Sequence, residues 1–175
     1  GSYMCGHVTT TGLSGIDWST GSLGHGLSVA CGKAIFSKIN KKKWNVYCLV
    51  SDGELDEGSN WESILFAGFH KLNNLKLIID YNKLQSIKSV KETLNLEPLK
   101  EKFQSFNWNF IEVDGHNHIQ LKKVLNKKFK NNKPTCILAN TIKGRGVSFM
   151  ENNNLWHYRC PNQKEYDQAI SELNA

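Results

Sequence analysis

Two polar residues, Asp52 and Asn82, each come close after an apolar run and could act together on a bound anion. They are separated by about thirty residues, the length of one β-α-β unit. If the two runs form neighbouring parallel strands, both side chains reach the same edge of the sheet. One carboxylate and one amide oxygen suit Mg²⁺, which completes its shell with water and substrate phosphate.

Gly53 supports a bound anion at this position, because it has no side chain that would occupy the space beside its backbone. A phosphate group can therefore approach its backbone, and the helix that follows would direct its first N–H groups at the anion. The spacing thus predicts a magnesium-bridged diphosphate. Taken alone, Asp52-Gly53 is also an ordinary turn sequence. The binding role is favoured because one full β-α-β unit separates Asp52 from Asn82 and because the acidic stretch 54–57 opens the predicted helix.

The elements that must position these residues alternate between strands and helices. Apolar runs typical of buried parallel strands are followed by amphipathic segments typical of helices. The predicted strands are 44–50, 75–80, 110–113 and 135–140, and the predicted helices are 21–38, 54–71, 96–106, 119–130 and 167–173. This order predicts an α/β fold, a doubly wound parallel sheet with helices on both faces. Residues 1–20 are expected to be a loop-like and incomplete leader, and residues 21–175 the binding domain.

Other polar residues also follow the predicted strands. They are Asp80-Tyr81 after the second strand, Asp114-Gly115-His116 after the third and Asn140-Thr141 after the fourth. His116 and His118 have only a superficial similarity to a metal-binding pair, and a polar turn is the favoured interpretation.

The charge and the cysteine content of the sequence argue against several classes of protein. The net charge is +6, and lysines gather at 41–43 and 127–130. No nucleic-acid-binding motif accompanies them, so we interpret these runs as solvated helix faces and a basic loop. Five cysteines without a C-x-x-C pair argue against a disulfide framework or zinc site and predict a reducing, cytoplasmic location. No run is long enough to span a bilayer.

Several separated segments resemble one family. Thiamine-diphosphate enzymes carry a motif that begins Gly-Asp-Gly and closes with Asn one β-α-β unit later, and here it stands as Ser51-Asp52-Gly53 to Asn82. Further segments resemble transketolase in the same order: its diphosphate-binding domain at 51–86, its glycine-rich loop at 20–28, its closing segments at 142–152 and Trp156-His157, and the end of the N-terminal subunit of split transketolases at 161–166. Together these motifs are far more specific than any one of them.

The resemblance implies a role for individual residues. Mg²⁺ would be bound by Asp52, the Asn82 side chain and the Leu84 carbonyl. The remaining implied positions are Gly53 and Glu54 along the diphosphate, Gly21, Ser22 and Leu23 against the cofactor, His157 near the diphosphate, His7 near the substrate, and Glu57 and Glu62 at a dimer contact that links two active sites. His7 is equally compatible with a surface histidine, and the two glutamates with solvated helix positions.

Two positions depart from the family pattern. Ser51 replaces the first glycine of the motif, which is acceptable if the position only needs a small residue and costly if it needs positive φ. His25 stands where the family usually has Gln. It could donate or accept a hydrogen bond in a similar way.

The resemblance also implies the activity and the partner. The cofactor would carry two-carbon ketol transfer from a ketose phosphate to an aldose phosphate, while the protein supplies position and electrostatics. The glutamate that contacts the aminopyrimidine belongs to a second, pyrimidine-binding domain, so a partner subunit is expected, in a dimer of two-domain units. The alternatives are the thiamine-binding subunit of a 2-oxoacid dehydrogenase, a deoxyxylulose-phosphate-type synthase, or a truncated non-catalytic paralogue.

Overall fold

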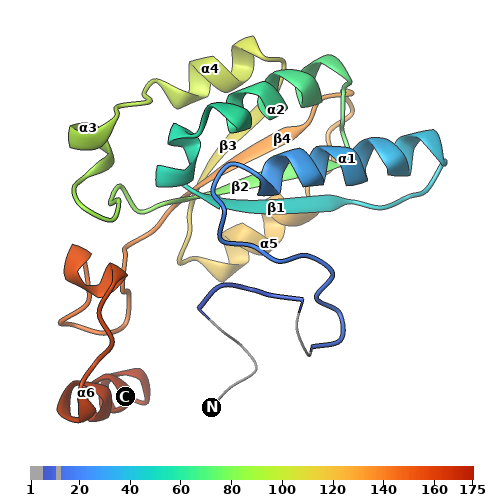
Figure 1. Cartoon of the computed structure of the whole chain (residues 1–175). Coiled ribbons are helices and arrows are strands. Elements are labelled where there is room, and N and C mark those ends of the chain that lie inside the picture. Colours follow the sequence, from blue (N-terminus) through green and yellow to red (C-terminus); the bar gives the residue numbers. More distant parts are fainter. Residues whose placement is uncertain (1–5, 11–12) are drawn as a thin grey trace.

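The computed structural model describes residues 6–10 and 13–175 and is built around a parallel sheet (Figure 1). Its four strands follow the order β1-β2-β4-β3. The strands are β1 Val46–Ser51, β2 Leu75–Tyr81, β3 Asn109–Asp114 and β4 Thr135–Asn140. The four predicted strands are therefore confirmed. The fourth has the predicted ends, and the other three differ at their ends by one or two residues.

The register of the strands places all four carboxyl ends along one edge of the sheet. Ser51 pairs with Asp80 between β1 and β2, while Asn140 of β4 pairs with Tyr81 on one side and Asp114 on the other. β1 and β2 are thus neighbours. The expectation that the segments after these two strands meet at the same edge is confirmed.

Helices cover both faces of the sheet, as predicted, but unevenly. The elements are α1 Gly26–Ile39, η1 Gly53–Asp56, α2 Gly58–Phe69, α3 Val90–Thr93, α4 Leu99–Ser105, α5 His118–Asn126, η2 Asn154–His157 and α6 Gln163–Leu173. Helices α1, α2 and α4 contribute to the larger core on one face, and α5 contributes to a smaller core on the other (Figure 1). The segment after β4 leads away from the sheet to η2 and α6.

Aromatic residues between helices and sheet form the centre of the larger core. The Phe103 and Trp108 rings are buried and meet edge to face, with centroids 5.5 Å apart. The Trp108 indole N–H donates to the Ile64 carbonyl of α2 at 2.9 Å, so the polar atom of this large side chain is satisfied. Cys48 and Cys136 are buried free thiols in the strands, where they pack as small hydrophobes.

The first helix begins later than predicted, at Gly26 rather than residue 21. Gly21 and Gly24 have φ of 118° and 81°, a conformation that no right-handed helix contains. The predicted helix 54–71 is also wrong as a single element. Its backbone becomes extended at Glu57, which separates η1 from α2, and α2 ends at Phe69.

Other helix ends differ for local reasons. Helix α5 ends at Asn126 instead of residue 130, because Lys127 is extended. Helix α4 begins after Pro98 rather than at 96, and α6 begins at Gln163 rather than at 167. The short α3 and η2 were not predicted. None of the described helices is long and apolar enough to cross a membrane.

The C-terminal part of α2 allows a direct test of this packing. A Cβ on Gly68 would lie 1.8 Å from the Phe106 carbonyl oxygen, which is backbone and cannot move aside easily. Gly68→Ala should therefore lower the free energy of unfolding by about 2 kcal/mol or more in chemical denaturation.

The matched control for this variant is Gly32→Ala in α1, where a new Cβ meets nothing within 4 Å. Alanine has the higher helix propensity, so this variant should gain about 0.5–1 kcal/mol. Equal effects of the two substitutions would contradict the packing described for α2.

Candidate functional site

The Asp52 carboxylate joins the segments that follow β1 and β2. One oxygen accepts the Gly53 backbone N–H at 2.8 Å, and the other accepts the Lys83 backbone N–H at 2.6 Å. The Asp52 backbone N–H donates to the Asp80 carbonyl at 3.2 Å, continuing the ladder between the strands. Asp52 is only 2% exposed, so these bonds hold a buried carboxylate at the carboxyl edge of the sheet.

Burial dominates the electrostatics of Asp52. The pKa of this carboxyl is raised to about 6, mainly by the loss of water. The N–H groups of Lys83 and Gly53 oppose the increase, and the nearby charge of Asp80 adds to it. Within the described part of the chain, no cationic side chain forms an ion pair with Asp52. Lys83 contributes its backbone N–H, and its ammonium group lies over the Tyr81 ring instead. The site therefore holds a negative charge without a protein counter-charge.

Asn82 and Leu84 lie in the turn after β2, next to the contact between Asp52 and Lys83. The Asn82 side-chain oxygen accepts the Leu84 backbone N–H at 3.0 Å. Lys83 has φ of 66°, and its carbonyl accepts the Val90 N–H at 3.0 Å, which closes the turn. The Leu84 carbonyl oxygen is used by none of the hydrogen bonds found among the described residues.

The oxygens of Asp52, Asn82 and Leu84 provide a carboxylate, an amide and a backbone carbonyl. These are the hard-oxygen donors that suit Mg²⁺, and the carboxylate lacks a cationic neighbour. The residues present therefore fit a divalent cation. No group of three or more His, Cys, Asp or Glu side chains suited to a metal occurs among the described residues, which excludes a His- or Cys-rich centre there.

The glycine-rich loop before α1 is attached to η1, the segment that follows Asp52. Glu54 accepts the Gly24 backbone N–H at 3.0 Å, and the Ser59 hydroxyl donates to the Gly24 carbonyl at 2.8 Å. A Cβ on Gly24 would lie 2.4 Å from the Ser59 oxygen, and the residue has positive φ, so only glycine fits. The structure thus brings the predicted loop and the predicted Glu54 together.

Gln85 is a residue of this site that the sequence patterns missed. A Cβ on Gly53 would lie 3.2 Å from the Gln85 Cγ, and the Gln85 amide donates to the Asp56 carboxylate at 2.8 Å. The open space expected beside Gly53 is therefore bounded by Gln85. No periodicity or turn signal marks Gln85, because its position depends on the turn at Lys83.

His7 lies against the glycine-rich loop. A Cβ on Gly21 would be 3.1 Å from the His7 ring, and the Thr20 N–H donates to the Val8 carbonyl at 2.8 Å. The loop residues Ser22 and Leu23 are exposed beside it. The structure therefore places His7 next to the residues predicted to contact the cofactor.

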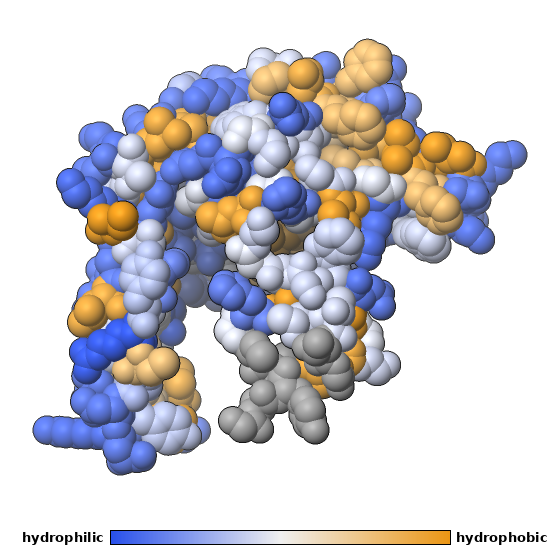
Figure 2. Space-filling view, in the orientation of Figure 1, coloured by the Kyte–Doolittle hydropathy of each residue, from blue (hydrophilic) through white to orange (hydrophobic). Residues whose placement is uncertain are grey.

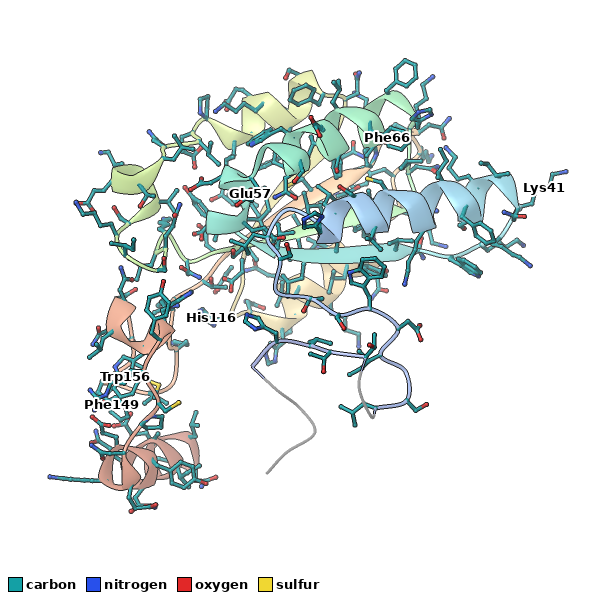
Figure 3. The ribbon with its side chains drawn as sticks, in the orientation of Figure 1. Lys41, Glu57, Phe66, His116, Phe149 and Trp156 are labelled. Carbon is teal, nitrogen blue, oxygen red and sulfur yellow. The ribbon has the colours of Figure 1, made fainter. Side chains whose placement is uncertain are left out.

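His157 lies in the C-terminal segment, in η2. Its Nδ1 is 3.3 Å from the Lys143 ammonium, and partial burial together with this positive charge lowers the pKa of the imidazole. The neighbouring Trp156 N–H donates to the Phe149 carbonyl at 2.9 Å, and their rings pack 5.0 Å apart (Figure 3). Among the described residues, no contact joins His157 to the oxygens of Asp52 or Asn82.

The remaining predicted residues have distinct places. Glu57 precedes α2 and Glu62 lies within it, and both are exposed. Figure 3 labels Glu57 near the start of α2. The His116 Nε2 accepts the Ile142 backbone N–H at 2.8 Å, so this histidine supports a turn, in agreement with the favoured interpretation. Ser51 ends β1 with ordinary strand pairing, and its hydroxyl accepts the Glu54 N–H at 3.0 Å.

Comparison with known proteins identifies relatives over the whole chain. The family model described as transketolase, thiamine diphosphate binding domain, matches residues 1–173. One subunit of the apulose-4-phosphate transketolase of Actinobacillus succinogenes is 41% identical over 172 residues, which are 98% of this chain and 62% of that protein. Human transketolase is 39% identical over 158 residues, which are 90% of this chain and 25% of that protein.

Solved structures agree with this match. A transketolase from Campylobacter jejuni superimposes with a TM-score of 0.85 at 29% identity, covering 91% of this chain and 26% of that one. The chain thus spans less than two thirds of its relative from Actinobacillus and about a quarter of the longer transketolases.

The raised pKa of Asp52 predicts an unusual pH dependence of stability without ligands. The folded pKa of about 6 lies above the usual value of 3.8, so protonation stabilises the fold. This contribution is fully present below the lower pKa and is lost as pH rises through the upper one. Relative to Asp52→Asn, the wild type should gain on the order of 1–2 kcal/mol between about pH 7.5 and about pH 4.5, after discounting for solvent screening.

Chemical denaturation of both proteins across that pH range measures the difference directly. The Asn variant serves as the reference because it keeps the side-chain size and lacks the ionisable group. A difference in free energy of unfolding that does not change with pH would contradict the assignment.

Proposed function

The chain belongs to the transketolase family, and we propose that it binds the diphosphate of thiamine diphosphate through Mg²⁺ as the N-terminal subunit of a split transketolase. In this proposal it takes part in two-carbon ketol transfer from a ketose phosphate to an aldose phosphate. The match to the family's thiamine-diphosphate-binding domain supports the cofactor. The match to relatives that are named as individual transketolase subunits supports the split arrangement.

One observation carries the metal part of the proposal, namely the uncompensated carboxylate of Asp52. A buried anion without a cationic partner is costly, and a divalent cation would remove that cost. Asp52, Asn82 and the Leu84 carbonyl would hold Mg²⁺, which would bridge to the diphosphate. Gly53 and Glu54 would lie along the diphosphate.

Residues around the metal site would position the rest of the cofactor. Gly21, Ser22 and Leu23 would lie against it, and the bond from Gly24 to Glu54 would keep this loop in place. When bound, the cofactor supplies the carbanion chemistry of ketol transfer. His7, beside Gly21, would contact the substrate, and His157, whose lowered pKa favours the neutral imidazole, would accept or donate hydrogen bonds near the diphosphate.

The proposed partner is a pyrimidine-binding subunit, which would provide the glutamate for the aminopyrimidine. The relatives named as single subunits extend well beyond the part matched here. Exposed apolar side chains on α1 and α2, among them Phe36, Phe66 and Phe69, suit association into a dimer of two-domain units (Figure 2). Glu57 and Glu62 would lie at that contact.

Other thiamine-diphosphate enzymes share the motif from Asp52 to Asn82, including 2-oxoacid dehydrogenases and deoxyxylulose-phosphate-type synthases. The match to transketolase in both sequence and structure favours ketol transfer over these reactions. A non-catalytic paralogue is the remaining alternative, and reconstitution with a partner separates it from the enzyme.

Removing the proposed metal ligand should abolish cofactor binding. We expect Asp52→Ala to weaken thiamine diphosphate binding in the presence of Mg²⁺ by more than about 100-fold in calorimetry, because no cation then bridges the diphosphate. Asp114→Ala is the matched control, since Asp114 is an exposed carboxylate at the end of β3 on the same sheet edge. Unchanged affinity in Asp52→Ala would make the metal assignment wrong.

Reconstitution tests the enzyme itself. The purified chain alone should lack ketol transfer, and activity should appear with a pyrimidine-binding transketolase subunit, thiamine diphosphate and Mg²⁺. Appreciable ketol transfer by the pure chain would contradict the two-subunit proposal. Cofactor binding without any activity in the mixture would favour the non-catalytic paralogue.

A further inference from the structure

A basic cleft lies at the amino ends of the strands, away from Asp52. Its volume is about 340 Å³, within the range of small-molecule sites. Seven lysines line it: Lys38, Lys42, Lys43, Lys76, Lys127, Lys128 and Lys133. Tyr47, Lys76 and Thr135 pair in one row across β1, β2 and β4 and form its floor.

The positive charge of the basic cleft has no matching acid. Its lining residues contain no Asp or Glu. Helices α1, α2 and α5 end beside it, and each helix C-terminus contributes about −0.5 of an elementary charge. The three helix dipoles therefore offset only a small part of the seven positive charges. Interaction with helix C-termini does not explain why so many lysines lie together in the cleft.

Two of the seven lysines already have structural roles. Lys38 donates to the His70 and Lys71 carbonyls after α2, at 3.3 and 2.7 Å. Lys76 donates to the Leu125 carbonyl and, at 3.0 Å, to the Lys127 carbonyl at the end of α5. An ammonium group has three donors, so one hydrogen of Lys76 remains for a ligand.

Four other lysines keep their ammonium groups unpaired. No hydrogen bond or ion pair among the described residues uses the side chains of Lys42, Lys43, Lys128 or Lys133. Lys42 and Lys43 directly follow Lys41, which Figure 3 labels at the end of α1 far from Glu57. These four residues follow α1, follow α5 or precede β4, so they line the cleft from different segments of the chain.

Lys76 adds a buried charge to this surface. The residue is 8% exposed, and desolvation followed by the charge of Lys128 lowers the pKa of its ammonium group. A bound anion would offset the repulsion between Lys76 and Lys128 and would stabilise the charged form of Lys76. The cleft also contains the half-exposed rings of Trp44 and Tyr47, which offer flat apolar surface beside the lysines.

We propose that the basic cleft binds an oligophosphate anion, a chain of at least three phosphate groups, at a second site separate from the predicted cofactor site. A single phosphate would use only a few of the lysines, whereas a triphosphate can meet several at once. The ligand would be a nucleoside triphosphate or an inorganic polyphosphate. Lysines from several elements surround one cleft of about 340 Å³, and this limited volume favours a small ligand over an extended nucleic acid.

Calorimetry with ATP and with tripolyphosphate tests this proposal on the full chain. EDTA in the buffer removes Mg²⁺, so binding through the Asp52 site is suppressed. The variant K42Q/K43Q/K128Q should weaken both ligands by about tenfold or more. K91Q/K100Q/K164Q is the matched control, because its three exposed lysines lie outside the cleft and the change in net charge is the same, and it should alter affinity by less than about twofold.

Each outcome has a definite meaning. Tighter binding of ATP than of tripolyphosphate supports the proposal with a nucleotide as the source, and equal affinity supports it with phosphate groups alone. Equal losses in the two triple variants would overturn it, because net charge would then explain the binding. An RNA oligonucleotide that binds much more tightly than ATP would also overturn the small-ligand proposal. Asp52→Ala should leave this affinity unchanged, which separates the cleft from the cofactor site.

Discussion

The Asp52 carboxylate and its two backbone hydrogen bonds are the constraint around which the rest of the site is arranged. The bond to the Lys83 N–H, at 2.6 Å, fixes the turn that contains Asn82 and Leu84. The bond to the Gly53 N–H begins η1, which carries Glu54 to the glycine-rich loop. One buried carboxylate therefore couples three separate segments of the chain. Its unmet charge is also the feature that best suits a divalent cation.

The two ends of the sheet have opposite electrostatic character, and the topology explains why. In a parallel α/β fold every helix returns the chain to the amino edge, so helix C-termini gather there. Lys38 and Lys76 donate to the carbonyls left open at those helix ends. The excess of lysines beyond this need distinguishes the basic cleft from ordinary capping. At the carboxyl edge the unbalanced group is instead the acid Asp52.

Much of the architecture could be predicted from the sequence because buried parallel strands are nearly continuous apolar runs. The pairing of Asp52 with the turn at Asn82 followed from the length of a β-α-β unit.

The ends of the helices were harder to predict from the sequence. The start of α1 depends on positive φ at Gly21 and Gly24, which a helical pattern does not reveal. In contrast, the capping boxes that begin α3 at Ser89 and α6 at Asn162 are sequence signals that mark the starts of these two helices. Other features of the site required the folded chain. Gln85 reaches Gly53 only because Lys83 turns the backbone. Four lysines of the basic cleft belong to the two runs interpreted as solvated, and only the folded chain brings them together with the other three.

Asp52 is expected to hold a divalent cation against a diphosphate, and this is the central claim. Anomalous X-ray scattering from crystals of the chain grown with thiamine diphosphate and Mn²⁺ in place of Mg²⁺ tests it most directly. We expect one strong peak coordinated by the Asp52 carboxylate, the Asn82 amide oxygen, the Leu84 carbonyl and the diphosphate. A diphosphate bound with its metal away from Asp52 would contradict it.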